Sequence, residues 1–317
     1  MSPMVTQGES SRPSESVSVI PTATWPETPP SPEEAGRYCR NLARSHYENF
    51  VVATFLLPSA LRQHLYNVYA YCRISDDLGD ESGEPQVALE RLKEWEAELN
   101  ACYLGQVRHP VFIALRETID RFEIPIQPFA DLLKAFQLDQ VKNRYETYAE
   151  LLDYCLYSAN PVGRLVLYLG GYRDPERQLL SDHTCTALQL ANHWQDIHLD
   201  LVRLNRIYLP LEDMRNFHYS EDDLRTQLCD SRFARLMQLE IGRARDLFHK
   251  GLRLASLVEP RLALDVELFG RCGLELLERI EAVNYDVFRR RPTVSKWART
   301  RLLVSCLRSL FVRRYSS

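Results

Sequence analysis

One stretch of the chain is especially informative: Asn192-His193-Trp194-Gln195-Asp196-Ile197-His198-Leu199-Asp200. On a helix, Asn192, Asp196 and Asp200 follow one another at four-residue intervals, so they line one face. The lead-in from Thr184 to Gln195 carries no formal charge and is rich in Ala and Leu, which is typical of a buried helix. Taken alone, the acidic face could be an ordinary solvated one. Carboxylates at the end of a buried helix, however, need a partner.

A second acid cluster lies upstream, in Arg73-Ile74-Ser75-Asp76-Asp77-Leu78-Gly79-Asp80. Asp76 and Asp80 share a helix face, and Asp77 lies about 100° round the helix. Two such clusters facing each other across a cavity repel unless a cation lies between them. Magnesium is the natural cation, because it takes oxygen ligands and is commonly shared between carboxylates and substrate phosphates. The two clusters together predict a magnesium site and a diphosphate substrate.

The two clusters resemble the aspartate-rich motifs of a known family. Asp76-Asp77-Leu78-Gly79-Asp80 matches the first motif, and Asn192-x-x-Gln195-Asp196-x-x-x-Asp200 the second, of the squalene and phytoene synthases. Features that resemble the hydroxysqualene synthase branch are His46-Tyr47-Glu48-Asn49-Phe50, Leu56-Leu57-Pro58, Asp131-Leu132-Leu133-x-Ala135-Phe136 and Ser158-Ala159-Asn160-Pro161-Val162-Gly163-Arg164. The resemblance runs from about residue 33 to about residue 300. It implies an all-α, single-domain isoprenoid-synthase fold with a central active-site cavity.

Composition also indicates an all-α protein, since only 12 glycines occur in 317 residues and helical spacing is far commoner than strand alternation. The expected helices cover 33–44, 60–79, 84–103, 109–122, 127–143, 147–157, 161–170, 175–201, 221–256, 261–289 and 293–312. Residues 1–36 hold seven of the 17 prolines and seven serines, a composition that cannot bury a core. We therefore predict a disordered tail over 1–32 and one helical domain over 33–317.

Charge and motif content exclude several classes of function. Residues 37–317 carry 38 basic and 38 acidic residues, and this balance disfavours a nucleic-acid binder. The eight cysteines are scattered without a Cys-x-x-Cys pattern, so we interpret them as small core residues in a reducing compartment. Neither a zinc motif nor a nucleotide-binding fingerprint occurs. No apolar run is long enough to cross a bilayer, so we expect a cytoplasmic protein, with contact at the inner membrane surface as a further option.

The resemblance also implies the roles of individual residues. Mg²⁺ would be held by Asp76, Asp80, Asn192, Asp196 and Asp200. The catalytic set would be Asp76, Asp80, Asp196, Asp200 and Tyr154. Substrate would be bound by Arg73, Asp77, Asp139, Gln195, Arg206, Tyr285, His46 and Asn160. Plainer interpretations stay open: Arg73 could form only a helix salt bridge, Tyr154 and Tyr285 could be half-buried tyrosines, and Asp139 could be a capping or surface acid.

Two departures from the family pattern bear on the product and on a turn. Related coupling enzymes carry a Gly where Asn160 stands and lack Pro161, which favours the hydroxysqualene branch. An ordinary turn between two helices is the alternative interpretation of Asn160-Pro161. Asn205 replaces the usual Gly before Arg206-Ile207-Tyr208-Leu209-Pro210, and because Asn tolerates left-handed backbone the turn can persist.

The activity implied is that of a lyase. Presqualene diphosphate ionises, the carbocation rearranges, and water captures it to give hydroxysqualene, in squalene and hopanoid biosynthesis. One alternative is a transferase that makes presqualene diphosphate, squalene or phytoene from two allylic diphosphates such as farnesyl diphosphate. The other is a non-catalytic helical assembly factor, although such a protein would be expected to lose motif acids, and none is lost here.

The C-terminal segment is strongly basic. After Asp286 the chain has no acid but carries Arg289, Arg290, Arg291, Lys296, Arg299, Arg301, Arg308, Arg313 and Arg314. Apolar residues lie between them, so a basic amphipathic helix in peripheral contact with a membrane is one interpretation. A terminal helix packed on the core with solvated arginines is the other. A phosphate contact from Lys296 or Arg299 is compatible with both.

Overall fold

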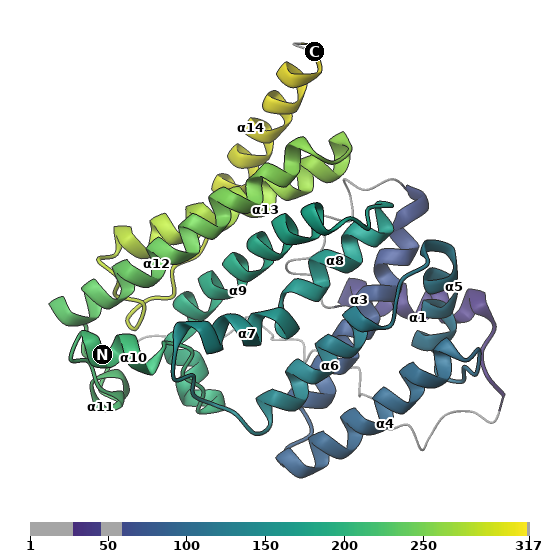
Figure 1. The fold of residues 1–317 in the computed structure, drawn as a ribbon, viewed down its shortest axis with the longest axis horizontal. Helices are drawn as coiled ribbons and strands as arrows, with labels where there is room; N and C mark the ends of the chain where they lie inside the picture. The colour runs from purple at the N-terminus through teal and green to yellow at the C-terminus, as the bar shows by residue number, and fades with distance from the viewer. Residues whose placement is uncertain (1–27, 46–58, 316–317) are drawn as a thin grey trace, which may run out of the picture.

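The computed structural model describes residues 28–45 and 59–315, with side chains described as far as residue 308. Within these ranges the chain forms helices and no strand, which confirms the predicted all-α class (Figure 1). The elements are α1 (Pro32–Ser45), α3 (Ser59–Asp80), α4 (Pro85–Tyr103), α5 (Pro110–Phe122), α6 (Gln127–Asp139), α7 (Tyr148–Ser158), α8 (Asn160–Leu169), α9 (Pro175–Leu204), α10 (Leu211–Asn216), α11 (Glu221–Arg225), α12 (Ser231–Gly251), the 3₁₀ helix η2 (Leu252–Ser256), α13 (Pro260–Ala282) and α14 (Lys296–Tyr315).

Local chemistry explains where the motif helix α9 begins and ends and where the first helix begins. Helix α9 begins at Pro175, whose fixed φ suits the first helical turn, and Asp174 caps it by accepting from the backbone N–H of Arg177. The same helix ends at Asn205, which has a left-handed φ of 51°, as the sequence allowed. Helix α1 begins at Pro32, so Ala35 is already buried although its segment is rich in Pro and Ser. The predicted tail up to residue 27 lies outside the described residues.

The single helix predicted over 221–256 is wrong. The chain forms α11 and α12 instead, because Asp230 caps a new helix by accepting from the N–H groups of Arg232 and Phe233. The short α10 was missed. Helix α13 ends at Ala282 rather than at residue 289, since Asn284 and Tyr285 adopt left-handed backbone. Helix α6 likewise ends at residue 139 rather than 143.

Both motif helices lie inside the molecule. Helix α9 packs against α7, α8, α12 and α13, and its Trp194 is fully buried. Helix α3 packs against α1, α4, α5, α6 and α8, and its Tyr71 is fully buried against Trp95. All eight cysteines are free, four of them buried. The two larger clusters of the core each include residues of one motif helix, and a smaller third cluster contains Leu167, Leu180, Leu254 and Leu262. The motifs lie near the ends of these two helices.

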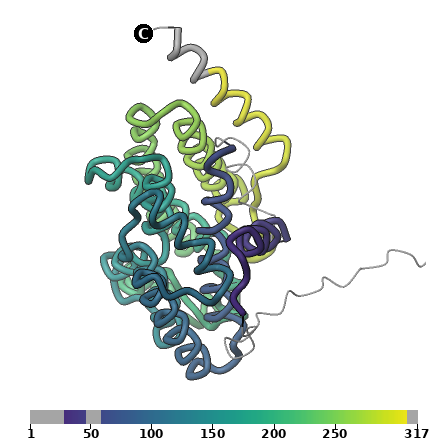
Figure 2. Tube along the Cα trace, turned by 90° about the vertical axis from the view of Figure 1, so that its right-hand side faces the viewer, coloured from purple at the N-terminus to yellow at the C-terminus, as the bar shows by residue number. Residues whose placement is uncertain are grey.

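Helix α14 differs from the others in its position. It packs on α13 near its own start and then extends away from the rest of the molecule, as two perpendicular views show (Figure 1; Figure 2). Within the described ranges, every helix is too short or too polar to span a bilayer.

Candidate active site

The first motif occupies the last turns of α3. Asp77 is buried and forms an ion pair with Arg73 one turn earlier, while Asp76 lies 3.7 Å from the same guanidinium. The intrahelical salt bridge is therefore the contact that Arg73 makes in this structure. Asp80, at the end of the helix, faces a different arginine, because Arg206 Nη2 lies 3.6 Å from its Oδ1.

The second motif lies on α9 beneath the segment that joins α13 to α14. Asp196 forms a two-pronged ion pair with Arg291, with a distance of 2.8 Å between Nη2 and Oδ2. The neighbouring Gln195 donates its side-chain N–H to the carbonyl of Pro292. The sequence showed that this segment is basic but not that Arg291 pairs with Asp196. Such a pair, 95 residues apart in the chain, requires the fold.

Arg206 and Asp139 connect elements that are distant in the chain. Arg206 Nη1 lies 3.8 Å from Asp139 Oδ2, and its Nη2 donates to the Asp139 backbone carbonyl at 3.2 Å. The Tyr154 hydroxyl donates to the same carboxylate at 3.0 Å. The structure thus brings the predicted residues Asp80, Asp139, Tyr154 and Arg206 together, from α3, α6, α7 and the turn after α9. The Asp139 side chain lies inside this group, with 10% of its surface exposed, rather than as a surface cap.

Electrostatic interactions link acids of both motifs to Asp139 and Arg206. Burial, reinforced by Asp80, raises the pKa of Asp76 to about 6. Burial also raises the pKa of Asp139 to about 7, against the lowering effect of Arg206 and with a raising effect from Asp80 and Asp76. Burial also raises the pKa of Asp200 to about 7, and the negative charges of Asp196 and Asp139 raise it further. Carboxylates of α3, α6 and α9 therefore destabilise one another's charged forms.

This donor set fits a hard cation. Carboxylate and amide oxygens are the ligands that Mg²⁺ prefers, and one carboxylate oxygen of Asp139 is buried without a hydrogen-bond partner. Among the described residues, however, no group of three or more His, Cys, Asp or Glu side chains is already spaced to hold a metal ion. Arg206 and Arg291 lie against the acids in this arrangement. Binding of an ion would require these arginines to move aside.

Aromatic rings form one wall beside the acids. The ring of His193 stacks on Tyr208 with 3.5 Å between centroids, and Tyr208 in turn stacks on Tyr145. Tyr154 packs against all three. Burial lowers the pKa of His193 to about 3, so this imidazole is neutral near pH 7. His193 and Tyr208 are not among the site residues predicted from the sequence, although both lie inside motifs quoted above.

An apolar cavity of about 440 Å³ opens beside the second motif. It lies between α9, α13 and the chain from residue 291 to residue 303. Its lining residues are Leu188, Ala191, Asn192, Gln195, Leu268, Phe269, Cys272, Gly273, Leu276, Arg291, Thr293, Val294, Arg299, Thr300 and Leu303. Polar and cationic groups thus border a mostly aliphatic space, which is the chemistry needed for a lipid chain that ends in an anion.

Three predicted site residues lie elsewhere or are not described. Asn160 is buried at the start of α8, where its side-chain oxygen accepts from the Thr186 hydroxyl at 2.8 Å and so ties α8 to α9. Tyr285 lies in the turn after α13, and its charged neighbours are Glu281 and Arg245. His46 lies outside the described residues.

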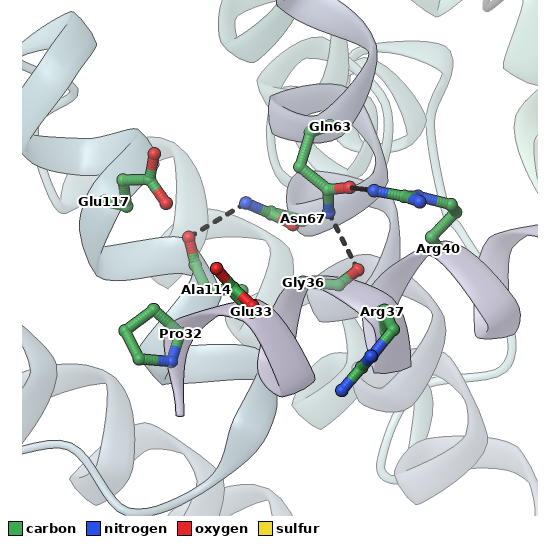
Figure 3. Close-up of a pocket in the computed structure, with 9 residues that line it drawn as sticks. All are labelled: Pro32, Glu33, Gly36, Arg37, Arg40, Gln63, Asn67, Ala114 and Glu117. Atoms are coloured by element: carbon green, nitrogen blue, oxygen red, sulfur yellow. Dashed lines mark hydrogen bonds between the residues drawn. The ribbon is translucent and has the colours of Figure 1, made fainter. Parts of the chain in front are cut away.

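A second cavity, of about 320 Å³, lies between α1, α3 and α5 (Figure 3). Its polar groups bind one another: Gln63 accepts from Arg40 and donates to the Gly36 carbonyl, and Asn67 donates to the Ala114 carbonyl. None of its lining residues belongs to the predicted site. We therefore interpret it as a gap in the packing of α1, α3 and α5 that hydrogen bonds between these helices span.

Comparison with known proteins identifies the family. The model of the squalene/phytoene synthase family matches residues 43–298. The chain belongs to the squalene/phytoene synthase family. A phytoene synthase of Arthrospira platensis is 32% identical over 282 residues, which cover 85% of this chain and 91% of that relative. A 15-cis-phytoene synthase of a Synechocystis strain is 33% identical over 297 residues, with coverage of 86% and 87%.

Two solved structures extend the comparison within the squalene/phytoene synthase family. The squalene synthase HpnC of Alicyclobacillus acidocaldarius is 45% identical, with a TM-score of 0.77 and coverage of 80% of this chain and 95% of that one. A dehydrosqualene synthase in complex with a ligand is 26% identical, with a TM-score of 0.80 and coverage of 89% and 98%. The resemblance noted from the two aspartate motifs is confirmed at the level of the family.

Proposed function

We propose that this family member ionises presqualene diphosphate and lets water capture the rearranged carbocation, giving hydroxysqualene. The observation that carries the proposal is the convergence of the two aspartate motifs around Arg206 and Asp139. The 45% identity to a structure named as a squalene synthase HpnC supports the choice of branch. The protein described here would act in squalene and hopanoid biosynthesis, in the cytoplasm.

Mg²⁺ is the cofactor in this proposal. Asp76, Asp80, Asn192, Asp196 and Asp200 are the residues that would hold it. When bound, it supplies Lewis-acid stabilisation of a diphosphate leaving group. The raised pKa values of Asp76 and Asp200 fit this assignment, because a cation would relieve the repulsion that contributes to both shifts.

The arginines would act on the leaving group. Arg291 and Arg299 border the apolar cavity beside Asn192, where a diphosphate would lie when its chain fills that cavity. A guanidinium binds phosphate oxygens through two parallel N–H donors, so Arg291 can exchange Asp196 for a phosphate at little geometric cost. Arg206, held by Asp139, would contribute positive charge from the other side. Charge developing on the diphosphate is thereby neutralised while the carbon–oxygen bond breaks.

The wall of the site would protect the cation. Tyr145, Tyr154 and Tyr208 form a buried aromatic cluster beside the acids, and aromatic rings can stabilise positive charge without attacking it. His193 is neutral and stacked, so it adds no competing charge. The Tyr154 hydroxyl is engaged with Asp139, which keeps that oxygen from trapping the cation early. A single water is then the nucleophile that the site must admit.

A transferase is the second candidate function, and the names of the relatives favour it. The curated relatives at 32–33% identity are named as phytoene synthases, which couple two allylic diphosphates. The same acids and arginines would serve that reaction, since it also begins with loss of diphosphate. Asn160 does not discriminate between the lyase and the transferase, because its side-chain oxygen accepts from the Thr186 hydroxyl and so joins two helices.

Separate supply of the two substrates tests the proposal. The full chain, with Mg²⁺ and no nicotinamide, should convert presqualene diphosphate to hydroxysqualene, and in ¹⁸O-water the alcohol should carry the label. Mass spectrometry reads both results. Formation of presqualene diphosphate, squalene or phytoene from an allylic diphosphate, with no hydroxysqualene from presqualene diphosphate, would establish the transferase instead.

A further inference from the structure

Helix α14 carries two apolar faces. Ala298, Leu302 and Cys306 follow at four-residue intervals, and Ala298 and Cys306 are buried. Burial raises the pKa of the Cys306 thiol, and Arg271 of α13 lies close enough to oppose that rise in part. Trp297 and Val304 are seven residues apart and are 85% and 43% exposed. At 100° per residue this second pair points about half a turn away from the first face.

The outer face is a stripe of apolar side chains bordered by arginines. Leu307, 46% exposed, continues the stripe from Trp297 and Val304. Arg301 and Arg308 lie within about 40° of Trp297 on the same helix. Arg301 is 69% exposed although it also reaches Glu275 of α13, at 2.8 Å. We define the outer face as Trp297, Arg301, Val304, Leu307 and Arg308.

The fold leaves this face accessible. Ala298 and Cys306, on the opposite side of α14, are buried, whereas among the described side chains of the outer face only Arg301 bonds to α13, through Glu275. The helix packs on α13 and extends beyond the body in both views (Figure 1; Figure 2). Among the large exposed apolar side chains of the described residues, Trp297 has the greatest exposed fraction. An indole ring is unfavourably exposed to water, and burying it against an apolar phase is favourable.

Charge decides which partner fits. The chain has no acidic residue after position 286, so two copies placed face to face would bring arginines together without compensation. A nucleic acid would satisfy the arginines but not the apolar stripe. An anionic bilayer satisfies both, because arginines bind headgroup phosphates while Trp and aliphatic side chains enter the boundary below them.

We propose that the outer face of α14 docks the protein on an anionic lipid surface. Trp297, Val304 and Leu307 enter the interface, and Arg301 and Arg308 contact the headgroups. The proposal rests on the surface of α14 alone and not on the reaction, so its test reads binding rather than turnover.

The test measures co-sedimentation of the full chain with vesicles. Vesicles of phosphatidylcholine with about one third phosphatidylglycerol should bind the protein, and raising the salt from roughly 0.1 M to 0.5 M should weaken binding. Tryptophan emission should shift to the blue on binding. The difference between the wild type and Trp297→Phe separates this indole from the other three tryptophans.

Two variants and two matched controls complete the test. Replacing Trp297, Val304 and Leu307 together by Ser, or Arg308→Glu alone, should each lower the vesicle partition coefficient about tenfold or more. Leu104→Ser, at a side chain 77% exposed after α4, and Arg235→Glu, on the exposed side of α12, should leave it unchanged.

Circular dichroism checks that every variant keeps the helical fold. Wild-type binding by the triple variant would overturn the proposal. Equal binding to pure phosphatidylcholine would do so too. A concentration-dependent dimer that the triple variant abolishes, with no vesicle binding, would assign the face to a second copy instead.

Discussion

At the residue scale, Arg206 is the side chain on which the candidate site depends most. It is 9% exposed and lies between Asp80 and Asp139, which come from α3 and α6. Burial alone would lower its pKa, and the neighbouring acids, Asp139 first, raise it above the usual value instead. Arg206 is therefore a permanent cation that compensates two carboxylates in a region with little water.

We expect Arg206→Gln to destabilise the protein strongly. Removing one partner of a buried ionic group leaves its carboxylates uncompensated, a loss of about 3 kcal/mol in the free energy of unfolding. Urea denaturation measures it. The matched control is Arg215→Gln, whose pair with Glu146 is more than half exposed and should change stability by about 1 kcal/mol or less. Equal effects of the two variants would show that Arg206 is not a buried compensating charge.

How much of the site the sequence could predict follows from particular residues. The four-residue spacings predict that Asp76 shares a face with Asp80 and Asp196 with Asp200, because a helix imposes this locally. The sequence also placed Asp139 and Tyr154 in the site, and the structure joins them by a hydrogen bond. The contact between Arg291 and Asp196 was not predictable, since it depends on how the chain after α13 returns over α9.

At the element scale, close approach of helices fixes the position of α9. A Cβ added at Gly251, the last residue of α12, would lie 2.1 Å from the Thr184 hydroxyl and 2.8 Å from the Thr184 backbone nitrogen on α9. A Cβ at Gly242, in the middle of the same helix, would meet nothing within 4 Å. The two glycines therefore serve different purposes, and only the first permits the contact between α9 and α12.

We expect Gly251→Ala to destabilise by about 1–3 kcal/mol, because backbone must shift to admit the methyl group. Gly242→Ala, the matched control, should stabilise by about 0.5–1 kcal/mol, since Ala loses less conformational entropy than Gly in a helix. Thermal denaturation of both variants measures the contrast. A neutral Gly251→Ala would mean that α9 and α12 are not in such close contact.

A buried acid on α13 gives a dependence of stability on pH. Asp265 is 5% exposed, one of its carboxylate oxygens has no hydrogen-bond partner, and burial raises its pKa to about 8. A carboxyl whose folded pKa exceeds its unfolded value stabilises the fold at low pH, and this contribution is lost as pH rises through the folded pKa. The window here runs from about pH 4 to about pH 8.

Asp265→Asn should remove this loss. We expect the variant and the wild type to melt at the same temperature near pH 4. At pH 8 the variant should melt at least a few degrees higher, because each loss of about 1 kcal/mol in the free energy of unfolding lowers the melting temperature by roughly 2–4 °C. The melting temperature followed across this pH range is the measurement. A constant difference between the two proteins at all pH values would contradict the assigned titration.

Helix boundaries show what local sequence can and cannot predict. The Pro and Asp signals at the start of α9 and the Asn at its end gave bounds close to those observed. The break before α12 was missed, although the Asp230 cap is a local signal, because apolar spacing continues through it. The early end of α13 depends on left-handed Asn284 and Tyr285, and few local rules favour that conformation at Tyr.

At the scale of the whole molecule, the candidate site joins α3 and α9, two helices that are far apart in the chain. Sequence predicts the acids on α3 and on α9, but their convergence depends on α6, α7 and the turn after α9, which lie between and around them. Long-range packing of this kind has no local signature. Formation of one magnesium-diphosphate site from both motifs therefore depends on the tertiary packing of these helices.

A double-mutant cycle on Asp80 and Asp196 tests the formation of this shared site most directly. The measured quantity is the Mg²⁺-dependent affinity for inorganic diphosphate, followed by calorimetry on the full chain. Asp120→Asn, at an exposed side chain of α5, is the control. We expect Asp80→Asn and Asp196→Asn each to lower the affinity at least tenfold, and the double variant to lose little more than either, because both acids serve one site. Independent losses that simply add, or an affinity unchanged in either single variant, would contradict a shared site.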